Sequence, residues 1–266
     1  MRARHSPARM AASLDPYIDL AHKLADASGA IARRYFRTRV AVDDKDDSSP
    51  VTIADREAEA AMRDLITKAF PNHGIIGEEH GREREGASEV WVLDPIDGTK
   101  SFITGRPLFG SLIALCRDGK PVVGVIDCPA LGERWVGAAG RPTTHLGKPV
   151  RTRACERLGL ASLICTSPLM FDADALPRFE RVRKAVKTPV YGGDCFAYGS
   201  VAAGFADLVI EAGLKIYDFA PFVPIFEGAG GGISDWNGKP LDLSSGDRVI
   251  AWGDARAHRE ALKLLA

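Results

Sequence analysis

One stretch decides the interpretation of this 266-residue sequence: Trp91-Val92-Leu93-Asp94-Pro95-Ile96-Asp97-Gly98-Thr99-Lys100-Ser101. The apolar residues before Asp94 predict a strand, and Pro95 and Gly98 predict a turn from which Asp97 projects. The backbone N–H groups of Gly98 and Thr99 then open a new segment, where such groups can receive phosphate oxygens. Two carboxylates on a turn can hold hard cations, which take oxygen ligands. The stretch therefore favours metal-assisted hydrolysis of a phosphate ester.

An isolated Asp-Gly pair most often makes only a turn, so the interpretation depends on other acidic residues. Glu78 and Glu79 follow the preceding predicted strand, and Asp55 lies in the second predicted helix. Asp218 follows a predicted strand at 208–210. Each has a structural alternative: Asp55 completes a helix capping box, the two glutamates form a solvated pair, and Asp218 is a helix N-cap.

The first half of the chain predicts two helices and a largely antiparallel sheet. Apolar residues keep helical spacing from Asp15 to about Phe36, and Thr52 and Asp55 predict the start of a second helix that stops at Pro71. The polar stretch Asp43–Ser49 between them is predicted to be a loop. Strands are predicted at 74–77, 90–93, 111–116, 122–126 and 134–136, with a hairpin turn at Asp118-Gly119.

The second half predicts a layered α/β arrangement. Strands are expected at 163–166, 190–191, 208–210 and 249–252, and helices near 175–187, 196–205, 219–229 and 255–265. Pro224 is expected to disturb the third of these helices. The fold class is therefore α+β: a disordered arm at 1–13, then a single catalytic domain at 14–266. Its antiparallel-sheet N-terminal lobe covers about 14–148, and a smaller α/β C-terminal lobe covers about 149–266.

Composition excludes several classes of protein. The 35 Lys and Arg residues balance 35 Asp and Glu residues, which argues against a nucleic-acid partner. No apolar run approaches the roughly 18 residues that a membrane span needs, so no membrane partner is expected. The 5 cysteines contain no Cys-x-x-Cys pair and predict neither a disulfide framework nor a cysteine zinc site. A reducing, cytoplasmic location is expected.

Together these residues resemble the inositol monophosphatase family of magnesium-dependent phosphatases, from about residue 15 to the end of the chain. The stretch 91–101 is the first motif of the resemblance, and Tyr217-Asp218 with the glycines of 228–232 is the second, with Tyr where many members have Trp. Within the family the chain is most similar to histidinol-phosphate phosphatases. The stretches that carry this closer similarity are Ser49–Asp55, Gly105–Phe109, Glu133–Trp135 and Gly192–Gly199. The resemblance implies a layered αβαβα sandwich.

The resemblance also implies a role for each acidic residue. The oxygen ligands of two or three Mg²⁺ ions would be Glu78, Asp94, the backbone carbonyl of Ile96, Asp97 and Asp218. Glu79 would lie beside them on a weaker metal or its waters. Asp55 would lie there too, as a catalytic candidate. Glu78 and Thr99 would orient the attacking water, without a covalent phosphoenzyme. The substrate would bind at Asp97, Gly98, Thr99, Gly193, Asp194, Glu211 and Asp218.

The expected substrate is a small phosphate monoester, first of all L-histidinol phosphate in histidine biosynthesis. Glu211 and Asp194 suit its ammonium and imidazole groups, whereas Asp194 has the alternative role of capping a helix near Phe196. Cys195 is expected to be a packed residue and not a nucleophile. The alternatives are an inositol monophosphate, a nucleotide 3′-phosphate, or a catalytically inactive binding protein on the same scaffold. The resemblance implies a homodimer.

Overall fold

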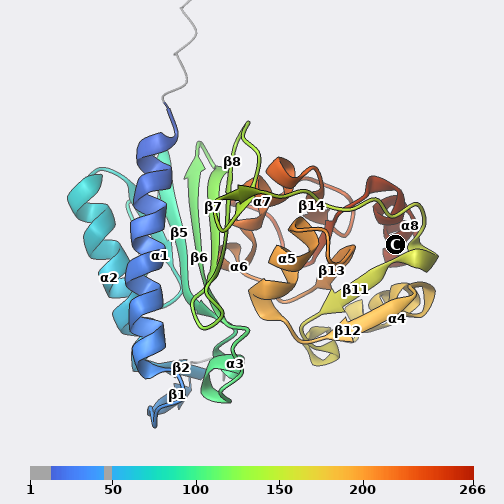
Figure 1. Ribbon diagram of the computed structural model, residues 1–266, viewed down its shortest axis with the longest axis horizontal. Helices are drawn as coiled ribbons and strands as arrows, with labels where there is room; N and C mark the ends of the chain where they lie inside the picture. Colours follow the sequence, from blue (N-terminus) through green and yellow to red (C-terminus); the bar gives the residue numbers. More distant parts are fainter. Residues whose placement is uncertain (1–12, 45–49) are drawn as a thin grey trace, which may run out of the picture.

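The structure is a computed structural model that describes residues 13–44 and 50–266. Its elements form five layers, helices–sheet–helices–sheet–helices, as Figure 1 shows from left to right. The predicted αβαβα sandwich is therefore confirmed. Apart from Ser13, the predicted N-terminal arm lies outside the described residues, as do residues 45–49 of the predicted loop. The first residues of that loop instead form strand β1 (Val42–Asp44), which pairs with β2 (Pro50–Thr52).

The first layer consists of two helices, α1 (Asp15–Tyr35) and α2 (Ile53–Ala69), that lie side by side on the first sheet. Their inward residues, among them Leu24 and Met62, pack against Trp91 of the sheet. The predicted capping box opens α2: Ala54 N–H donates to the Thr52 hydroxyl, and Thr52 N–H donates to a carboxylate oxygen of Asp55 at 2.8 Å. The structural alternative for Asp55 is thus confirmed, and it leaves the carboxylate only 1% exposed.

The first sheet has eight strands in the order β10-β9-β8-β7-β6-β5-β3-β4, and only β3 and β5 pair in parallel. Their bounds are β3 Gly74–Gly77, β4 Gly81–Glu83, β5 Glu89–Asp97, β6 Gly110–Arg117, β7 Lys120–Cys128, β8 Glu133–Ala138, β9 Thr144–His145 and β10 Lys148–Pro149. All five strands predicted here are present. The predicted boundary between the lobes falls within β10 and stays a prediction.

The predicted turn is present at Gly98, but its predicted start at Pro95 is wrong, because β5 continues to Asp97. Between Asp94 and Asp97 the register with β6 shifts, so two residues of β5 oppose Ser111. A bulge of this kind tolerates a proline, which has no N–H to donate to the ladder. The Pro95 carbonyl accepts hydrogen bonds from the hydroxyls of Ser111 (2.8 Å) and Ser28 (3.2 Å). The bulge thus turns the two aspartates toward the middle layer of the molecule.

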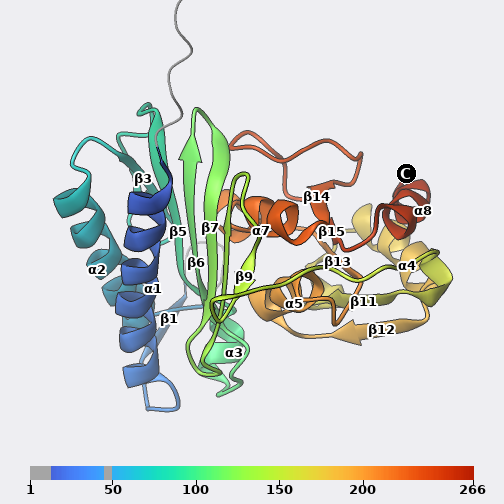
Figure 2. The same cartoon turned by 45° about the horizontal axis from the view of Figure 1, so that its top comes forward.

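The middle layer holds α5 (Asp194–Ala202), α6 (Ile216–Phe219) and α7 (Phe222–Ala229), all labelled between the two sheets in Figure 1; Figure 2 shows α5 and α7 there from another side. The helix predicted at 219–229 is broken near Pro221, and the expectation that Pro224 disturbs it is wrong. Pro224 is the third residue of α7, where a backbone N–H has no partner within the helix in any case. The layer packs closely: a Cβ on Gly124 of β7 would lie 2.0 Å from the Pro221 carbonyl oxygen.

The last two layers are a five-stranded sheet, ordered β12-β11-β13-β15-β14, and the helices that cover its far face. The strands are β11 Ser162–Cys165, β12 Thr188–Tyr191, β13 Leu208–Glu211, β14 Gly232–Asp235 and β15 Val249–Trp252. The outer helices are α4 (Ala175–Ala185) and α8 (Ala255–Leu265). A five-residue helix, α3 (Thr99–Ile103), follows β5, and the short turns η1 (Leu158–Leu160) and η2 (Pro168–Met170) flank β11. Among the described residues, no helix combines the length and apolarity needed to cross a membrane.

Candidate active site

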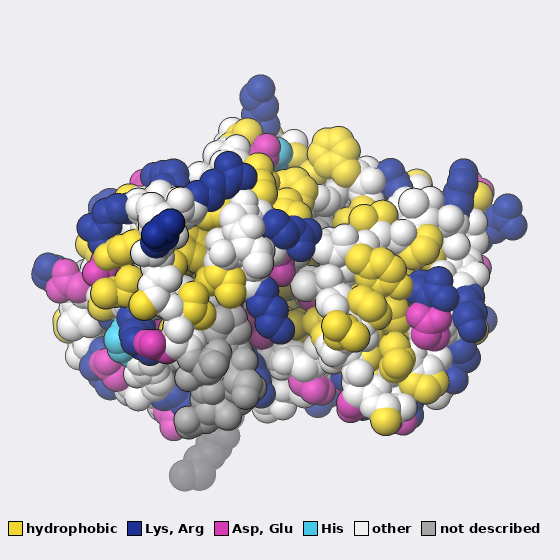
Figure 3. Space-filling view, turned by 90° about the horizontal axis from the view of Figure 1, so that it is seen from below, with side chains coloured by type: hydrophobic (Ala, Val, Ile, Leu, Met, Phe, Trp, Pro, Cys, Tyr) yellow, Lys and Arg dark blue, Asp and Glu magenta, His cyan; other side chains and the backbone are white. Residues whose placement is uncertain are grey.

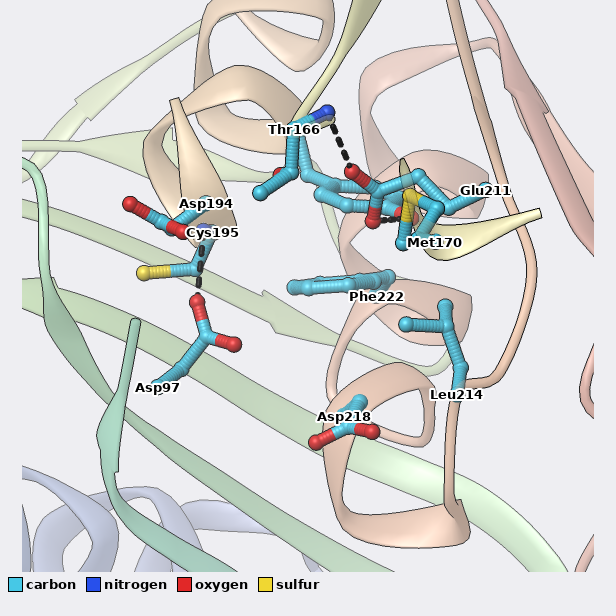
Figure 4. Close-up of a pocket in the computed structure, with 10 residues that line it drawn as sticks. Asp97, Thr166, Met170, Asp194, Cys195, Glu211, Leu214, Asp218 and Phe222 are labelled. Atoms are coloured by element: carbon cyan, nitrogen blue, oxygen red, sulfur yellow. Dashed lines mark hydrogen bonds between the residues drawn. The ribbon is translucent and has the colours of Figure 1, made fainter. Parts of the chain in front are cut away.

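Three carboxylates meet where β5 ends against the middle layer. Asp94 and Asp97 come from the bulge of β5, and Asp218 comes from α6. One oxygen atom from each lies within 4.8 Å of the others. Asp94 is only 2% exposed. Figure 4 shows Asp97 and Asp218 at the base of the pocket that they share. The structure therefore brings Asp218, which is distant in sequence, to the neighbouring pair Asp94 and Asp97, and all three were predicted to bind metal.

The backbone of the bulge is fixed by its own side chains. Asp94 accepts a hydrogen bond from the Ile96 N–H at 3.0 Å, and the Thr99 hydroxyl donates to the Ile96 carbonyl at 3.1 Å. Gly98 precedes α3 in a left-handed conformation (φ 80°), which glycine adopts without steric cost. A Cβ there would lie 2.7 Å from the carboxyl carbon of Asp194, so Gly98 also lies against the opposite wall of the pocket.

Asp97 ties the first sheet to the middle layer. Its carboxylate accepts a hydrogen bond from the Cys195 N–H at 2.6 Å, at the start of α5. The alternative prediction that Asp194 caps this helix is wrong: Asp194 is its first residue, and its carboxylate accepts from the Ser101 hydroxyl at 2.6 Å. Gly193 is the N-cap residue of α5, with φ 138°. Cys195 is 1% exposed, so its prediction as a packed residue is confirmed.

Asp218 is the third residue of α6 and accepts a hydrogen bond from the Lys215 N–H at 2.6 Å. It is not the N-cap residue, which is Lys215, so that structural alternative is wrong as stated. Burial, with a smaller contribution from the negative charge of Glu78, raises the pKa of Asp218 to about 7. The Asp218 carboxylate thus belongs to the shared cluster and also accepts the hydrogen bond from Lys215 that stabilises the start of α6.

The electrostatics of the cluster favour a cation. Burial and the neighbouring charges of Glu78 and Asp97 raise the pKa of Asp94 well above its ordinary value, and burial with the charge of Asp194 does the same for Asp97. Two carboxylates about 4 Å apart repel by about 4 kcal/mol at an effective dielectric constant of 20. Hard divalent cations prefer such oxygen donors, so the residues fit the predicted Mg²⁺.

Glu78 and Glu79 follow β3, which pairs with β5. The Glu78 N–H donates to the Leu93 carbonyl at 3.2 Å, next to Asp94. The negative charge of Glu78 raises the pKa of both Asp94 and Asp55, after burial as the main cause. The predicted candidates Glu78 and Asp55 therefore lie near the cluster, and their catalytic roles stay predictions.

A second group of residues forms the wall of the pocket toward the second sheet (Figure 4). The pocket has a volume of about 130 Å³ and is lined by Asp97, Thr166, Met170, Asp194, Cys195, Tyr198, Glu211, Leu214, Asp218 and Phe222. Glu211 is 3% exposed and accepts hydrogen bonds from the Tyr198 hydroxyl (2.9 Å) and the Thr166 N–H (2.9 Å). Both substrate acids predicted from the sequence, Glu211 and Asp194, thus share the pocket of Asp97 and Asp218.

Sequence reasoning missed several residues of the site. Tyr198 and Thr166 donate hydrogen bonds to Glu211. Burial raises the pKa of Asp194, and the hydrogen bond from Ser101 and the charge of Arg106 oppose this rise. Figure 3 shows basic side chains around the junction of the two halves of the molecule, with acidic ones deeper between them. Glu59, which is fully buried on α2, was also missed. Its position four residues after Asp55, on the inward face of a helix, was the available signal.

Comparison with known proteins assigns the class of this fold and site. Residues 13–266 match the inositol monophosphatase family, and the chain belongs to it. The chain is 50% identical to the bifunctional phosphatase IMPL2, chloroplastic, of Arabidopsis thaliana, over 99% of this chain and 79% of that protein. It is 35% identical to the histidinol-phosphatase of Chlorobaculum parvum, over 91% and 94% of the two chains. The structure of an inositol monophosphatase from Zymomonas mobilis superposes with a TM-score of 0.88, at 46% identity, over 96% and 99% of the two chains. This protein is therefore a phosphatase of the inositol monophosphatase family.

Proposed function

We propose that this protein is a Mg²⁺-dependent histidinol-phosphate phosphatase, which converts L-histidinol phosphate and water to L-histidinol and phosphate in histidine biosynthesis. The observation that carries the proposal is a second pair of acids, Asp194 and Glu211, in the same pocket as Asp97 and Asp218. The similarity to a histidinol-phosphatase supports it.

Five groups would hold two or three Mg²⁺ ions: the carboxylates of Glu78, Asp94, Asp97 and Asp218 and the carbonyl of Ile96. Glu79 would stand beside them. When bound, Mg²⁺ lowers the pKa of water and stabilises negative charge on phosphate and on the leaving oxygen. The buried carboxylate of Asp94 and the partly buried carboxylates of Glu78, Asp97 and Asp218 would balance this positive charge.

The chain itself places the phosphate and the attacking water. The N–H groups of Gly98 and Thr99, at the end of β5, would hold phosphate oxygens. Glu78 and the Thr99 hydroxyl would orient the water for direct attack on phosphorus, and Asp55 would support Glu78 from α2. The Cys195 thiol is no nucleophile in this scheme, because burial raises its pKa well above the ordinary value.

The leaving group decides between substrates. Histidinol phosphate carries an ammonium and an imidazole, whereas an inositol ring carries only hydroxyls, which gain less from a buried carboxylate. Glu211 accepts two hydrogen bonds that keep its carboxylate in the pocket, beside the ring of Phe222 (Figure 4). We therefore assign the amino alcohol to the wall formed by Glu211 and Asp194.

The test is phosphate release from a panel of esters with Mg²⁺: histidinol phosphate, inositol 1-phosphate and a nucleotide 3′-phosphate. The proposal expects the highest kcat/KM for histidinol phosphate. A clear preference for inositol 1-phosphate would replace it with the second candidate, which is favoured by the similarity to a structurally solved inositol monophosphatase. Release of phosphate from none of the esters would favour the remaining alternative, a catalytically inactive binding protein.

We also propose a homodimer, on the basis of the resemblance, and a cytoplasmic location, on the basis of the cysteine content. Light scattering would test the homodimer, and fractionation of cells would test the location.

A further inference from the structure

Glu59 is a buried carboxylate outside the metal-binding cluster. It projects from α2 and is 0% exposed. Its Oε2 accepts a hydrogen bond from the Glu79 N–H at 2.7 Å, and its Oε1 accepts one from the His80 N–H at 3.1 Å. Oε1 also accepts from Nε of Arg63 at 2.7 Å. Both oxygens thus receive donors, and two of the three donors are backbone groups of the segment that carries Glu78 and Glu79.

The contact is direct and tight. A Cβ built on Gly77 would lie 2.0 Å from Oε1 of Glu59, so the carboxylate packs on the backbone of Gly77 itself. On its other side this segment is held by β5: Gly77 pairs with Leu93, and the Glu78 N–H donates to the Leu93 carbonyl at 3.2 Å. The backbone of residues 77–80 is therefore fixed from two sides, by β5 and by Glu59.

We propose that Glu59 is a positioning residue for the metal site, which fixes the backbone at Glu79 and His80 and thereby orients the carboxylates of Glu78 and Glu79. The proposal rests on the proposed function, because it takes Glu78 as a metal ligand. Groups that orient metal ligands commonly change metal affinity or activity roughly 10- to 100-fold when they are removed.

A purely structural role for Glu59 is the competing explanation. Arg63, its charged partner, also donates to Glu83 at 2.8 Å and to the Gly81 carbonyl, so the same network supports the turn between β3 and β4. Glu83 offers a matched control. Glu83→Gln makes the same chemical change in the same network and leaves in place the hydrogen bonds that Glu59 accepts from the Glu79 and His80 N–H groups.

The decisive variant is Glu59→Gln. It keeps the size of the side chain, but the new amide nitrogen has to face a donor, either the Glu79 N–H or the His80 N–H with Arg63. Binding of Mn²⁺, as a probe for Mg²⁺, is measured by titration calorimetry on the full chain, and melting in EDTA is followed in parallel. Hydrogen exchange of peptides that span residues 78–81 reports on the backbone.

The expected result for Glu59→Gln is a Kd for Mn²⁺ raised roughly 10- to 100-fold, with faster exchange at residues 78–81, while Glu83→Gln stays within about 3-fold of wild type. Wild-type Mn²⁺ affinity in a cooperatively melting Glu59→Gln protein would overturn the proposal. If Glu59→Gln does not melt cooperatively, Glu59→Asp replaces it in the test. Its side chain keeps the charge but is one methylene shorter, and the same rise in the Kd for Mn²⁺ and the same faster exchange are expected. A wild-type protein that binds Mn²⁺ but hydrolyses no ester would refute the proposed function and leave this test valid.

Discussion

Replacing Glu211 with glutamine removes one negative charge from the wall of the pocket and leaves the metal-binding cluster intact. In the wild-type protein, Glu211 is 3% exposed and its carboxylate receives the Tyr198 hydroxyl and the Thr166 N–H. A hydrogen bond to a charged group is worth about 1.5–3 kcal/mol, which corresponds to a factor of roughly 10 to 150 in kcat/KM. We therefore expect Glu211→Gln to lose that factor for histidinol phosphate.

The assay compares two substrates in one protein. Phosphate release from histidinol phosphate and from inositol 1-phosphate is measured at saturating Mg²⁺, and the ratio of the two kcat/KM values removes any loss of folded enzyme. Glu227→Gln, an exposed residue on α7, is the matched control and should leave the ratio unchanged. An unchanged ratio in Glu211→Gln would refute the assignment of the substrate ammonium or imidazole to this wall. Burial raises the pKa of Glu211, so this carboxylate gains its proton at a higher pH than an ordinary glutamate does. The wild-type preference for histidinol phosphate should therefore decline at that higher pH as the solution is acidified.

Three further predictions follow from the site and its packing. Asp97→Asn should lower kcat by more than about 100-fold, which exceeds the usual effect of removing a residue that only orients a metal ligand. The variant should still melt cooperatively, and wild-type turnover would contradict the role of Asp97 as a ligand. Because burial raises the pKa of Asp218 to about 7, the native metal-free protein binds more protons than the unfolded chain between about pH 4 and 7. Its melting temperature in EDTA should therefore fall as the pH rises through that window, and Mg²⁺ should flatten the curve; a flat curve in EDTA would argue against the buried cluster. Gly124→Ala, whose Cβ would lie 2.0 Å from the Pro221 carbonyl oxygen, should lower the unfolding free energy by about 1–3 kcal/mol, whereas Gly86→Ala, with no atom within 4 Å, should not.

Local signals in the sequence predicted most of the helices and strands, and the family resemblance predicted their layered αβαβα arrangement. The spacing of apolar residues predicted α1, and the pair Thr52 and Asp55 predicted the start of α2, as found. For these two helices the residue types alone restrict the backbone. Which acids meet at the end of β5 was predicted through the family resemblance that the motifs around Asp97 and Asp218 carry.

The rest depended on tertiary contacts that no local pattern records. Pro95 indicates a turn by itself, but Ser28 on α1 and Ser111 on β6 hold its carbonyl and keep it within a bulged strand. Glu59 is an ordinary helix residue in sequence, and only the approach of β3 turns its carboxylate into an acceptor for the Glu79 N–H. The helical break near Pro221 was missed for the same reason, since Pro224 drew attention to the wrong position.

The central claim is that the cluster of Asp94, Asp97 and Asp218 at the end of β5 forms a magnesium-dependent site that hydrolyses histidinol phosphate. The most direct measurement is steady-state phosphate release from histidinol phosphate and inositol 1-phosphate, each with Mg²⁺ and with EDTA. The account predicts turnover that EDTA abolishes and Mg²⁺ restores, with the higher kcat/KM for histidinol phosphate. Turnover that survives EDTA, or a higher kcat/KM for inositol 1-phosphate, would contradict it.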